Sequence, residues 1–400
     1  MKKVFLTSVC IVLLSLSVFS QKTARDYRLF GRITTVDNQI LTGFLTWGKQ
    51  QMYWIDFFRA SKIINPYREY FTPDMNVTFI SDGRTTHLAP LHVFTCRFGN
   101  IESVELTDYN KIRLQVKGGY SMELSRGSYE DIGASITVFQ EDASSSVIRW
   151  DKISKIEFMP ACFDAPDYHL PITGIIKTNQ GIYKGFITWD RDEKNLEDLL
   201  DGRSRQGDCH ISFRNIRKIV KTRDGCEVST SDGNILNLWG SNDVNNQNRG
   251  ILVNMPQTGR VSIPWNRFEA FEALNFNEIA PSGYDDFKAV RRLQAEVHTR
   301  KGEIFNGIIA YDLDEAMNLE VLDGKNDNIN YEIPFKYIQS IEPKNYRYSF
   351  VTLTNGASFS LGDTSDVTNE NSGILVFSSD EIPIYIPWKD IKLISFHPEE

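Results

Sequence analysis

The stretch Ile386–Phe396, IPWKDIKLISF, places three apolar residues at intervals of three, Trp388, Ile391 and Ile394. The chain contains the same spacing five more times, at Phe98-Ile101-Val104, Trp150-Ile153-Ile156, Phe213-Ile216-Ile219, Trp265-Phe268-Phe271 and Phe335-Ile338-Ile341. This interval does not suit a straight strand, in which side chains alternate between two faces. It suits a 3₁₀ turn, in which residues three apart eclipse one another. Each copy therefore predicts a 3₁₀ turn that begins at the aromatic residue and leads into a strand.

Longer repeats surround these phrases. Thr178–Gly202 and Thr299–Gly324 share glycines and acidic residues, and Val228–Val253 matches Val351–Val376 without a gap. Thr35–Phe58 is a more diverged copy of the first pair. Self-similarity of this kind indicates a tandem array. We therefore expect three units, each holding the phrase twice, and call them unit 1 (residues 28–160), unit 2 (170–273) and unit 3 (292–398).

Each half of a unit has the pattern of two strands joined by a glycine turn, a polar loop, two further strands and the phrase. Alternating apolar and polar residues with Asn-Gly or Asp-Gly turns are typical of β-hairpins. We predict an all-β fold of three tandem repeats, each made of two small five-stranded barrel half-units or of one fused two-sheet unit, with short linkers. Closing a short sheet into a barrel would remove its edge strands. In the linker 277–293, Phe287, Val290 and Leu293 share a helical stripe, which predicts a short helix.

Two stretches of unit 3 carry a resemblance to a known family: VHTRKGEIFNGIIAYDLDEAMNLEVLDG (Val297–Gly324) and YEIPFKYIQSI (Tyr331–Ile341). The first half of each unit resembles the Sm/LSm group of small β-barrels and its SH3-like relatives, at the level of the fold. Proteins of that group bind RNA through an Asp and an Asn after the second strand and an Arg-Gly before the last. Here Asp312 and Asn318 are off that spacing and Pro334 stands where the Arg would be, so RNA binding is not implied. The units are also similar to repeats in uncharacterised exported bacterial proteins, a likeness that implies no activity.

The chain begins with a pattern typical of a secretory signal peptide. Lys2 and Lys3 precede an apolar run that ends near Ser20, and we predict cleavage after that residue. The mature protein is then exported, periplasmic or at the cell surface, and no later stretch is long and apolar enough for a transmembrane segment. The net charge of -8, with no basic block, argues against a nucleic-acid partner.

Cysteine and histidine spacing predicts no metal site and no catalytic motif. In an exported protein the four remaining cysteines could form bridges, with Cys209 and Cys226 the closest candidates, or stay buried thiols. Their order in the chain is Cys96, Cys162, Cys209 and Cys226. The six histidines are scattered, and the motifs of serine hydrolases, zinc proteases and phosphate-binding loops are absent from the sequence.

Acidic loops in units 2 and 3 are the first candidate site. Each loop places three carboxylates within one turn, and oxygen-rich clusters suit calcium. The spacing is not that of an EF-hand, and a solvated loop whose carboxylates cap a turn is the competing interpretation. The calcium hypothesis therefore rests on Asp190, Asp192 and Glu193 in unit 2 and on Asp312, Asp314 and Glu315 in unit 3. No other cofactor is expected.

Aromatic residues are the second candidate site. Trp47, Trp189 and Tyr311 occupy equivalent positions, where they either pack in the core or stack on a sugar. Met52–Phe71 is peculiar to unit 1 and dense in aromatic residues, so an exposed apolar patch there would mark a partner surface. The residues of that predicted surface are Tyr53, Trp54, Phe57, Phe58, Tyr67 and Tyr70; burial within the fold is the alternative.

Three functions follow from these patterns. The first is a non-catalytic exported interaction or scaffold protein of the cell envelope, whose tandem units give multivalent contact with an envelope protein or a polysaccharide. The second is a carbohydrate- or calcium-dependent surface-binding protein, which is favoured if equivalent aromatic residues are exposed. The third is a hydrolase with its site between barrels, which would need a deep pocket that holds carboxylates or a histidine.

Overall fold

The structure is a computed structural model, and it describes residues 27–48, 50–72, 75, 79–81, 86–88, 93–164, 170–378 and 382–397. The predicted signal peptide, residues 1–20, lies outside these ranges. Within them, no helix is long and apolar enough to cross a membrane. The described fold is all-β, with large antiparallel sheets and helical segments of single 3₁₀ turns.

Unit 1 contributes one ten-stranded sheet. Its strands are β1 (Phe30–Thr35), β2 (Ile40–Trp47), β3 (Phe57–Lys62), β6 (Val93–Arg97), β7 (Ile101–Asp108), β8 (Lys111–Val116), β9 (Ser121–Ser125), β10 (Ile136–Phe139), β11 (Ser145–Ile148) and β12 (Ile153–Phe158). They pair in the order β11-β10-β2-β1-β12-β7-β8-β9-β3-β6. A separate hairpin is formed by β4 (Phe79–Ser81) and β5 (Thr86–Leu88).

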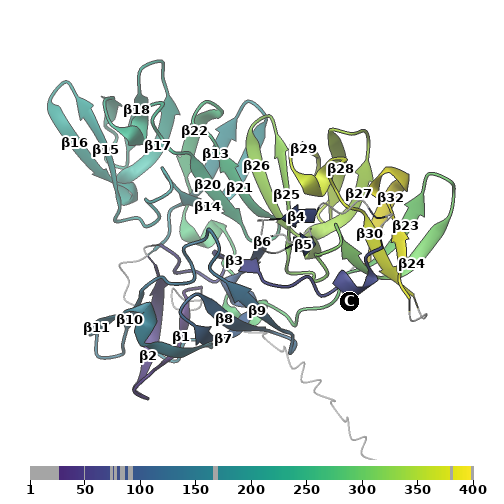
Figure 1. Cartoon of the computed structure of the whole chain (residues 1–400). Helices are drawn as coiled ribbons and strands as arrows, with labels where there is room; N and C mark the ends of the chain where they lie inside the picture. The colour runs from purple at the N-terminus through teal and green to yellow at the C-terminus, as the bar shows by residue number, and fades with distance from the viewer. Residues whose placement is uncertain are drawn as a thin grey trace, which may run out of the picture.

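Units 2 and 3 share one sheet and lie side by side, with unit 1 beneath them (Figure 1). The strands of unit 2 are β13 (Thr173–Thr178), β14 (Gly181–Thr188), β15 (Leu199–Ser204), β16 (Gly207–Ser212), β17 (Ile216–Lys221), β18 (Cys226–Thr230), β19 (Ile235–Leu238), β20 (Ile251–Met255), β21 (Gly259–Ile263) and β22 (Phe268–Ala273). Those of unit 3 are β23 (Gln294–Thr299), β24 (Ile304–Tyr311), β25 (Val321–Asn326), β26 (Ile329–Pro334), β27 (Ile338–Pro343), β28 (Tyr348–Leu353), β29 (Ser358–Gly362), β30 (Ile374–Phe377), β31 (Ile384–Ile386) and β32 (Ile391–Phe396). The pairing of β21 with β26, in which Val261 faces Tyr331, joins the two units.

The three units pair their strands in a corresponding order. In unit 3 the order is β31-β30-β24-β23-β32-β27-β28-β29-β25-β26, which is the order of unit 1 strand for strand. Unit 2 follows it as well, except that β15 forms no ladder with β19; an isolated bridge between Arg203 and Trp239 and hydrogen bonds of Asp201 connect the β15–β16 hairpin to the rest.

No closed barrel is found among the described strands, so the prediction of two five-stranded barrels per unit is not met. The two halves of a unit exchange strands instead. In unit 3, β24 of the first half pairs with β30 of the second, and β23 pairs with β32. Because these strand edges are satisfied by the other half, neither half closes on itself.

The phrase that recurs in the sequence adopts the predicted conformation. Five copies form a 3₁₀ turn that leads directly into a strand, at Phe98–Asn100, Trp150–Lys152, Phe213–Asn215, Phe335–Tyr337 and Trp388–Asp390. The sixth, at residues 265–267, is a hydrogen-bonded turn before β22. In all six copies the three apolar side chains are buried, so each turn delivers them to the core of its unit.

The predicted helix in the linker 277–293 is absent. The structure has two short 3₁₀ turns there, Phe276–Glu278 and Tyr284–Asp286, followed by a segment without regular secondary structure. Phe287 and Val290 are buried as the stripe predicted, but against unit 1, where the Phe287 ring lies against Gly99. The Lys117 ammonium group lies 3.0 Å from the Phe287 carbonyl oxygen, and the Val290 N–H donates to the Lys117 carbonyl. Contacts with another unit therefore replaced the hydrogen bonds of a helix.

Candidate functional site

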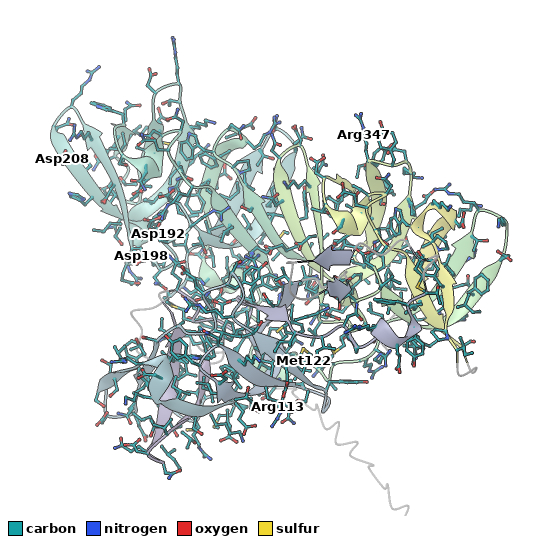
Figure 2. All side chains as sticks on the ribbon, in the orientation of Figure 1. Arg113, Met122, Asp192, Asp198, Asp208 and Arg347 are labelled. Carbon is teal, nitrogen blue, oxygen red and sulfur yellow. The ribbon has the colours of Figure 1, made fainter. Side chains whose placement is uncertain are left out.

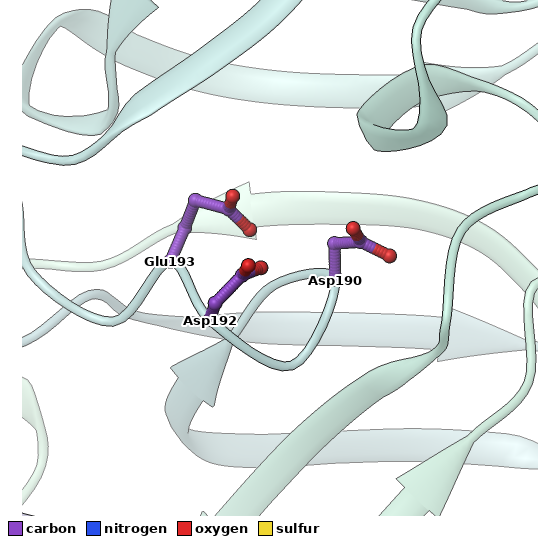
Figure 3. A group of neighbouring side chains, drawn as sticks. All are labelled: Asp190, Asp192 and Glu193. Atoms are coloured by element: carbon purple, nitrogen blue, oxygen red, sulfur yellow. The ribbon is translucent and has the colours of Figure 1, made fainter. Parts of the chain in front are cut away.

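The acidic loop of unit 2 follows β14 and brings Asp190, Asp192 and Glu193 onto one turn (Figure 3). A bridge between Trp189 and Glu193 closes the turn. Within it Asp190 (φ +45°) and Arg191 (φ +69°) adopt the left-handed conformation, which Asp enters more readily than most residues. The three carboxylates offer oxygen atoms within 4.8 Å of one another. The structure thus brings these three candidate residues together.

Arg249 supplies the positive charge of this loop. Its Nε and Nη2 atoms lie 3.0 and 2.8 Å from Asp190 Oδ2, and Nη2 also pairs with Asp192. The buried Asp190 carboxylate accepts two more hydrogen bonds, from the Arg249 backbone N–H and the Asn242 amide. The carboxylate therefore ties two loops of the unit together. A calcium ion would need the same oxygens, so it would have to displace a guanidinium group; calcium at this loop stays a prediction.

Glu193 is the carboxylate of this loop that Arg249 does not reach. Its Oε2 atom is buried and has no hydrogen-bond partner among the described residues. Burial, reinforced by the negative charges of Asp243 and Asp192, raises the pKa of Glu193 to about 9, so its side chain is neutral at pH 7. Burial also raises the pKa of Asp243, to about 6.

The equivalent loop of unit 3 has the same carboxylates in a different setting. Asp312, Asp314 and Glu315 are all buried, at 0, 3 and 4% exposure. Ser372 stands where unit 2 has Arg249, and it offers only its backbone N–H to Asp312. Among the described residues, three ligand oxygens within 4.8 Å of one another are found in the unit 2 loop and not in this one. The two loops therefore differ although their sequences repeat.

Unit 1 supplies a positive charge to the unit 3 loop. Lys62 Nζ lies 3.1 Å from Asp314 Oδ1 and 2.7 Å from Glu320 Oε1, with its side chain 9% exposed. Burial alone would lower the pKa of Lys62, but the attraction of Glu320 and Asp314 outweighs it and raises the pKa above its usual value. Nearby, the Asn65 amide donates to the Leu313 carbonyl at 2.9 Å. Part of the aromatic stretch of unit 1 thus docks on this loop.

One buried or half-buried carboxylate per unit was missed by the sequence analysis. In each unit it accepts the backbone N–H groups of two consecutive residues in the preceding loop, at 2.6–3.0 Å. Such bonds hold an irregular loop in one conformation. The three carboxylates are Asp56, Asp198 and Glu320. Each follows Trp47, Trp189 or Tyr311 at the same distance along the chain, and this constant spacing could have identified them from the sequence.

The contact between units 1 and 2 uses one of these carboxylates. Lys194 Nζ lies 2.7 Å from Asp56 Oδ1, and both side chains are buried, at 9 and 3% exposure. Burial lowers the pKa of Lys194, and the single carboxylate of Asp56 does not fully offset it. The Tyr53 hydroxyl donates to Asn195 Oδ1 at 2.7 Å in the same contact. Figure 2 shows Asp198 and Asp192 on the side of unit 2 toward unit 1, and Asp208 at the far end of the β15–β16 hairpin.

The equivalent aromatic residues Trp47, Trp189 and Tyr311 are fully buried. Each donates its polar hydrogen to a backbone carbonyl at the corresponding position of the unit, which belongs to Asp131, Asp243 or Asp366. These rings form the core, as the packing interpretation expected, and no face of theirs is open to a sugar. Of the other tryptophans outside the phrase, Trp54 is buried and Trp239 is 39% exposed.

The residues of the predicted partner surface face the interior of the protein. Tyr53, Trp54, Phe57, Phe58 and Tyr67 are buried, and Tyr70 is half-buried against Phe377 of unit 3. Their apolar area is covered by the chain's own units. This stretch therefore holds units together. Burial within the fold was the alternative interpretation of the sequence.

The remaining candidates of the sequence are dispersed. The four cysteines that the structure describes are free thiols, which is the second of the two alternatives left open by the sequence; Cys209 and Cys226, the closest candidates for a bridge, are among them. Of the histidines whose side chains the structure describes, His210 pairs with Asp201 on an exposed hairpin at 2.7 Å. His397 borders a cavity of 580 Å³ whose described lining contains no carboxylate. His298 pairs with Glu296 on β23.

Comparisons with protein-family models, with curated proteins and with solved structures gave no match to this chain. The function must therefore be argued from the residues and their geometry.

Proposed function

We propose that this chain is a non-catalytic, exported interaction protein of the cell envelope, built from three tandem units related to the SH3-like and Sm-like barrels. Its partner is an envelope protein or a polysaccharide, contacted at several points at once. The corresponding strand order of the three units supports the tandem architecture. The buried ion pairs of Lys62 and Lys194 support a rigid arrangement of the units, because each joins unit 1 to a different neighbour.

The observation that carries the proposal is one exposed isoleucine per unit at an equivalent position. Ile40, Ile182 and Ile304 are 63, 68 and 58% exposed. Each isoleucine lies three residues before a glycine, and these glycines are Gly43, Gly185 and Gly307. Because each glycine has no Cβ, the neighbouring strand can approach closely, so the three isoleucines occupy the same position of the fold. Single exposed apolar residues are common. However, this isoleucine is not needed for the core, and an isoleucine recurs at this position in all three units. Three equal apolar contacts on one rigid body suit a multivalent partner.

Binding to isolated cell envelopes tests this proposal. The mature protein, residues 21–400, is titrated onto envelopes and the bound fraction is measured by co-sedimentation. Replacing all three isoleucines by threonine, which keeps the β-propensity, should weaken binding about 100-fold or more, with single replacements giving small losses. The matched control replaces Ile235 and Val147, which are 63 and 68% exposed, and should bind as the wild type does. Equal binding of the triple variant and the wild type would sink the proposal.

Export is tested separately by cell fractionation. The proposal expects the protein in the exported fraction with Gln21 as its first residue, which mass spectrometry of the N-terminus reports. An uncleaved chain in the cytoplasm would contradict it. Protease treatment of the envelopes then distinguishes a protein partner, whose binding is lost, from a polysaccharide, whose binding persists.

A further inference from the structure

A cavity of 390 Å³ lies where all three units meet. Its floor is the β21–β26 strand pair, in which Arg260 faces Glu332. Arg59 of β3 enters it from unit 1, and Arg191 of the acidic loop enters it from unit 2. Its volume is within the range of small-molecule sites.

Three guanidinium groups and two carboxylates line this cavity. The arginines are Arg59, Arg191 and Arg260, and the carboxylates are those of Glu332 and Asp323. Burial, together with the positive charge of Arg59, lowers the pKa of Arg260 to about 9. A guanidinium group normally stays charged far above that value, so an anion in contact with Arg260 would stabilise its charged form.

Hydrogen-bond donors are left over on each arginine. Arg260 uses Nε and Nη2 on Glu332, at 2.6 and 2.9 Å, and Arg59 uses Nη2 on the same carboxylate. Arg191 uses Nε on the Arg249 carbonyl and Nη2 on Ser262. The Nη1 groups of the three arginines make no hydrogen bond to any described residue. The three arginines that carry these donors come from three different strands or loops and border one concave space.

The arginines are also held in place. Arg260 lies over the Phe57 ring, with its guanidinium carbon 4.7 Å from the ring centroid. Both Arg260 and Arg59 are fixed by Glu332, so little side-chain entropy is lost when a ligand binds. A planar carboxylate accepts in one plane, whereas a tetrahedral oxyanion accepts hydrogen bonds from several directions.

We infer that this cavity binds a phosphate or sulfate group, held by the Nη1 donors of Arg59, Arg191 and Arg260. The group is either a free inorganic ion or part of a phosphorylated small molecule. This site is separate from the isoleucine positions, so it goes beyond the interaction function and is tested without it.

Isothermal titration calorimetry of the mature protein with sodium phosphate, sodium sulfate and glycerol 3-phosphate, at constant ionic strength, tests the site. Arg191→Asn removes one donor, suits the left-handed backbone at this position and leaves the Glu332 ion pairs intact. It should weaken phosphate binding about tenfold, the usual loss for one charge-assisted hydrogen bond. Tighter binding of glycerol 3-phosphate than of inorganic phosphate would identify a phosphorylated small molecule, and the reverse order a free ion.

Arg267→Ala is the matched control, because Arg267 also joins units 2 and 3, through Asp327, but does not border the cavity. It should bind phosphate as the wild type does. If Arg191→Asn is poorly folded, Arg59→Lys replaces it, since a lysine keeps the charge but loses the planar donor pair. No heat of binding with the wild type, or equal affinities of the cavity variant and Arg267→Ala, would overturn the inference.

Discussion

The acidic loops of units 2 and 3 repeat in sequence and differ in what neutralises them. In unit 2 the cation is Arg249, from the same unit, with a side chain that is half exposed. In unit 3 a serine stands at that position, and Lys62 of unit 1 takes over the role from a buried position. The first loop is a tie within a unit, and the second is a link between units. The same repeated motif therefore stabilises contacts within one unit or between two units, depending on where the residue of opposite charge lies in the chain.

The largest effect is expected where the counter-charge is buried. Lys62→Met should lower the free energy of unfolding by about 3–5 kcal/mol, because it removes the buried ammonium group that pairs with the carboxylates of Asp314 and Glu320. Urea denaturation followed by fluorescence measures this. Adding Glu320→Gln to Lys62→Met is the control and should recover part of the loss. A loss below about 1 kcal/mol, the value for an exposed pair, would show that the loop of unit 3 does not depend on unit 1.

A smaller loss of unfolding free energy is expected for the contact between units 1 and 2. Lys194→Met should cost about 2 kcal/mol, a typical value for a hydrogen bond to a charged group. The effect is smaller because Lys194 pairs with one buried carboxylate, Asp56, whereas Lys62 pairs with two. The same urea experiment measures it. A cost larger than that of Lys62→Met would reverse the proposed order of the two contacts.

Arg249→Ser gives the loop of unit 2 the residue that unit 3 has. It should cost about 1 kcal/mol, because the arginine is half exposed and its ion pairs are screened by solvent. It also frees Asp190 and Asp192 for a metal ion. Thermal denaturation with excess calcium should therefore raise the midpoint of the variant more than that of the wild type. Equal calcium responses would remove the loop of unit 2 from the calcium hypothesis.

The smallest effect is expected in the pH dependence of stability. Because the pKa of Glu193 is raised to about 9 in the folded state, its contribution is fully present below pH 4.5 and is lost as the pH rises toward 9. Glu193→Gln cannot ionise, so the variant should lose less stability than the wild type between pH 5 and pH 9. Solvent near this half-buried group screens the effect. Urea midpoints across this range measure the slope; parallel slopes for both proteins would contradict the raised pKa.

Much of the local structure could be predicted, and the candidate sites largely could not. The grouping of Asp190, Asp192 and Glu193 followed from their closeness in the chain. Their neutralisation by Arg249 did not, because that residue is distant in sequence and meets the loop only through the pairing of β14 with β20. Likewise, nothing near Tyr53 or Phe57 in the sequence indicates that other units cover them.

The sequence by itself determined the strands and the turns of the aromatic phrase, though not the linker 277–293. Alternating apolar residues, glycine turns and the aromatic phrase each act over a few residues, so strands and 3₁₀ turns form where the patterns place them. Tertiary structure alone decided how these elements combine. The two halves of a unit exchange strands instead of closing into barrels, and Lys62 meets Asp314 across more than half the chain, because edge pairing and buried charge are satisfied between segments far apart in sequence.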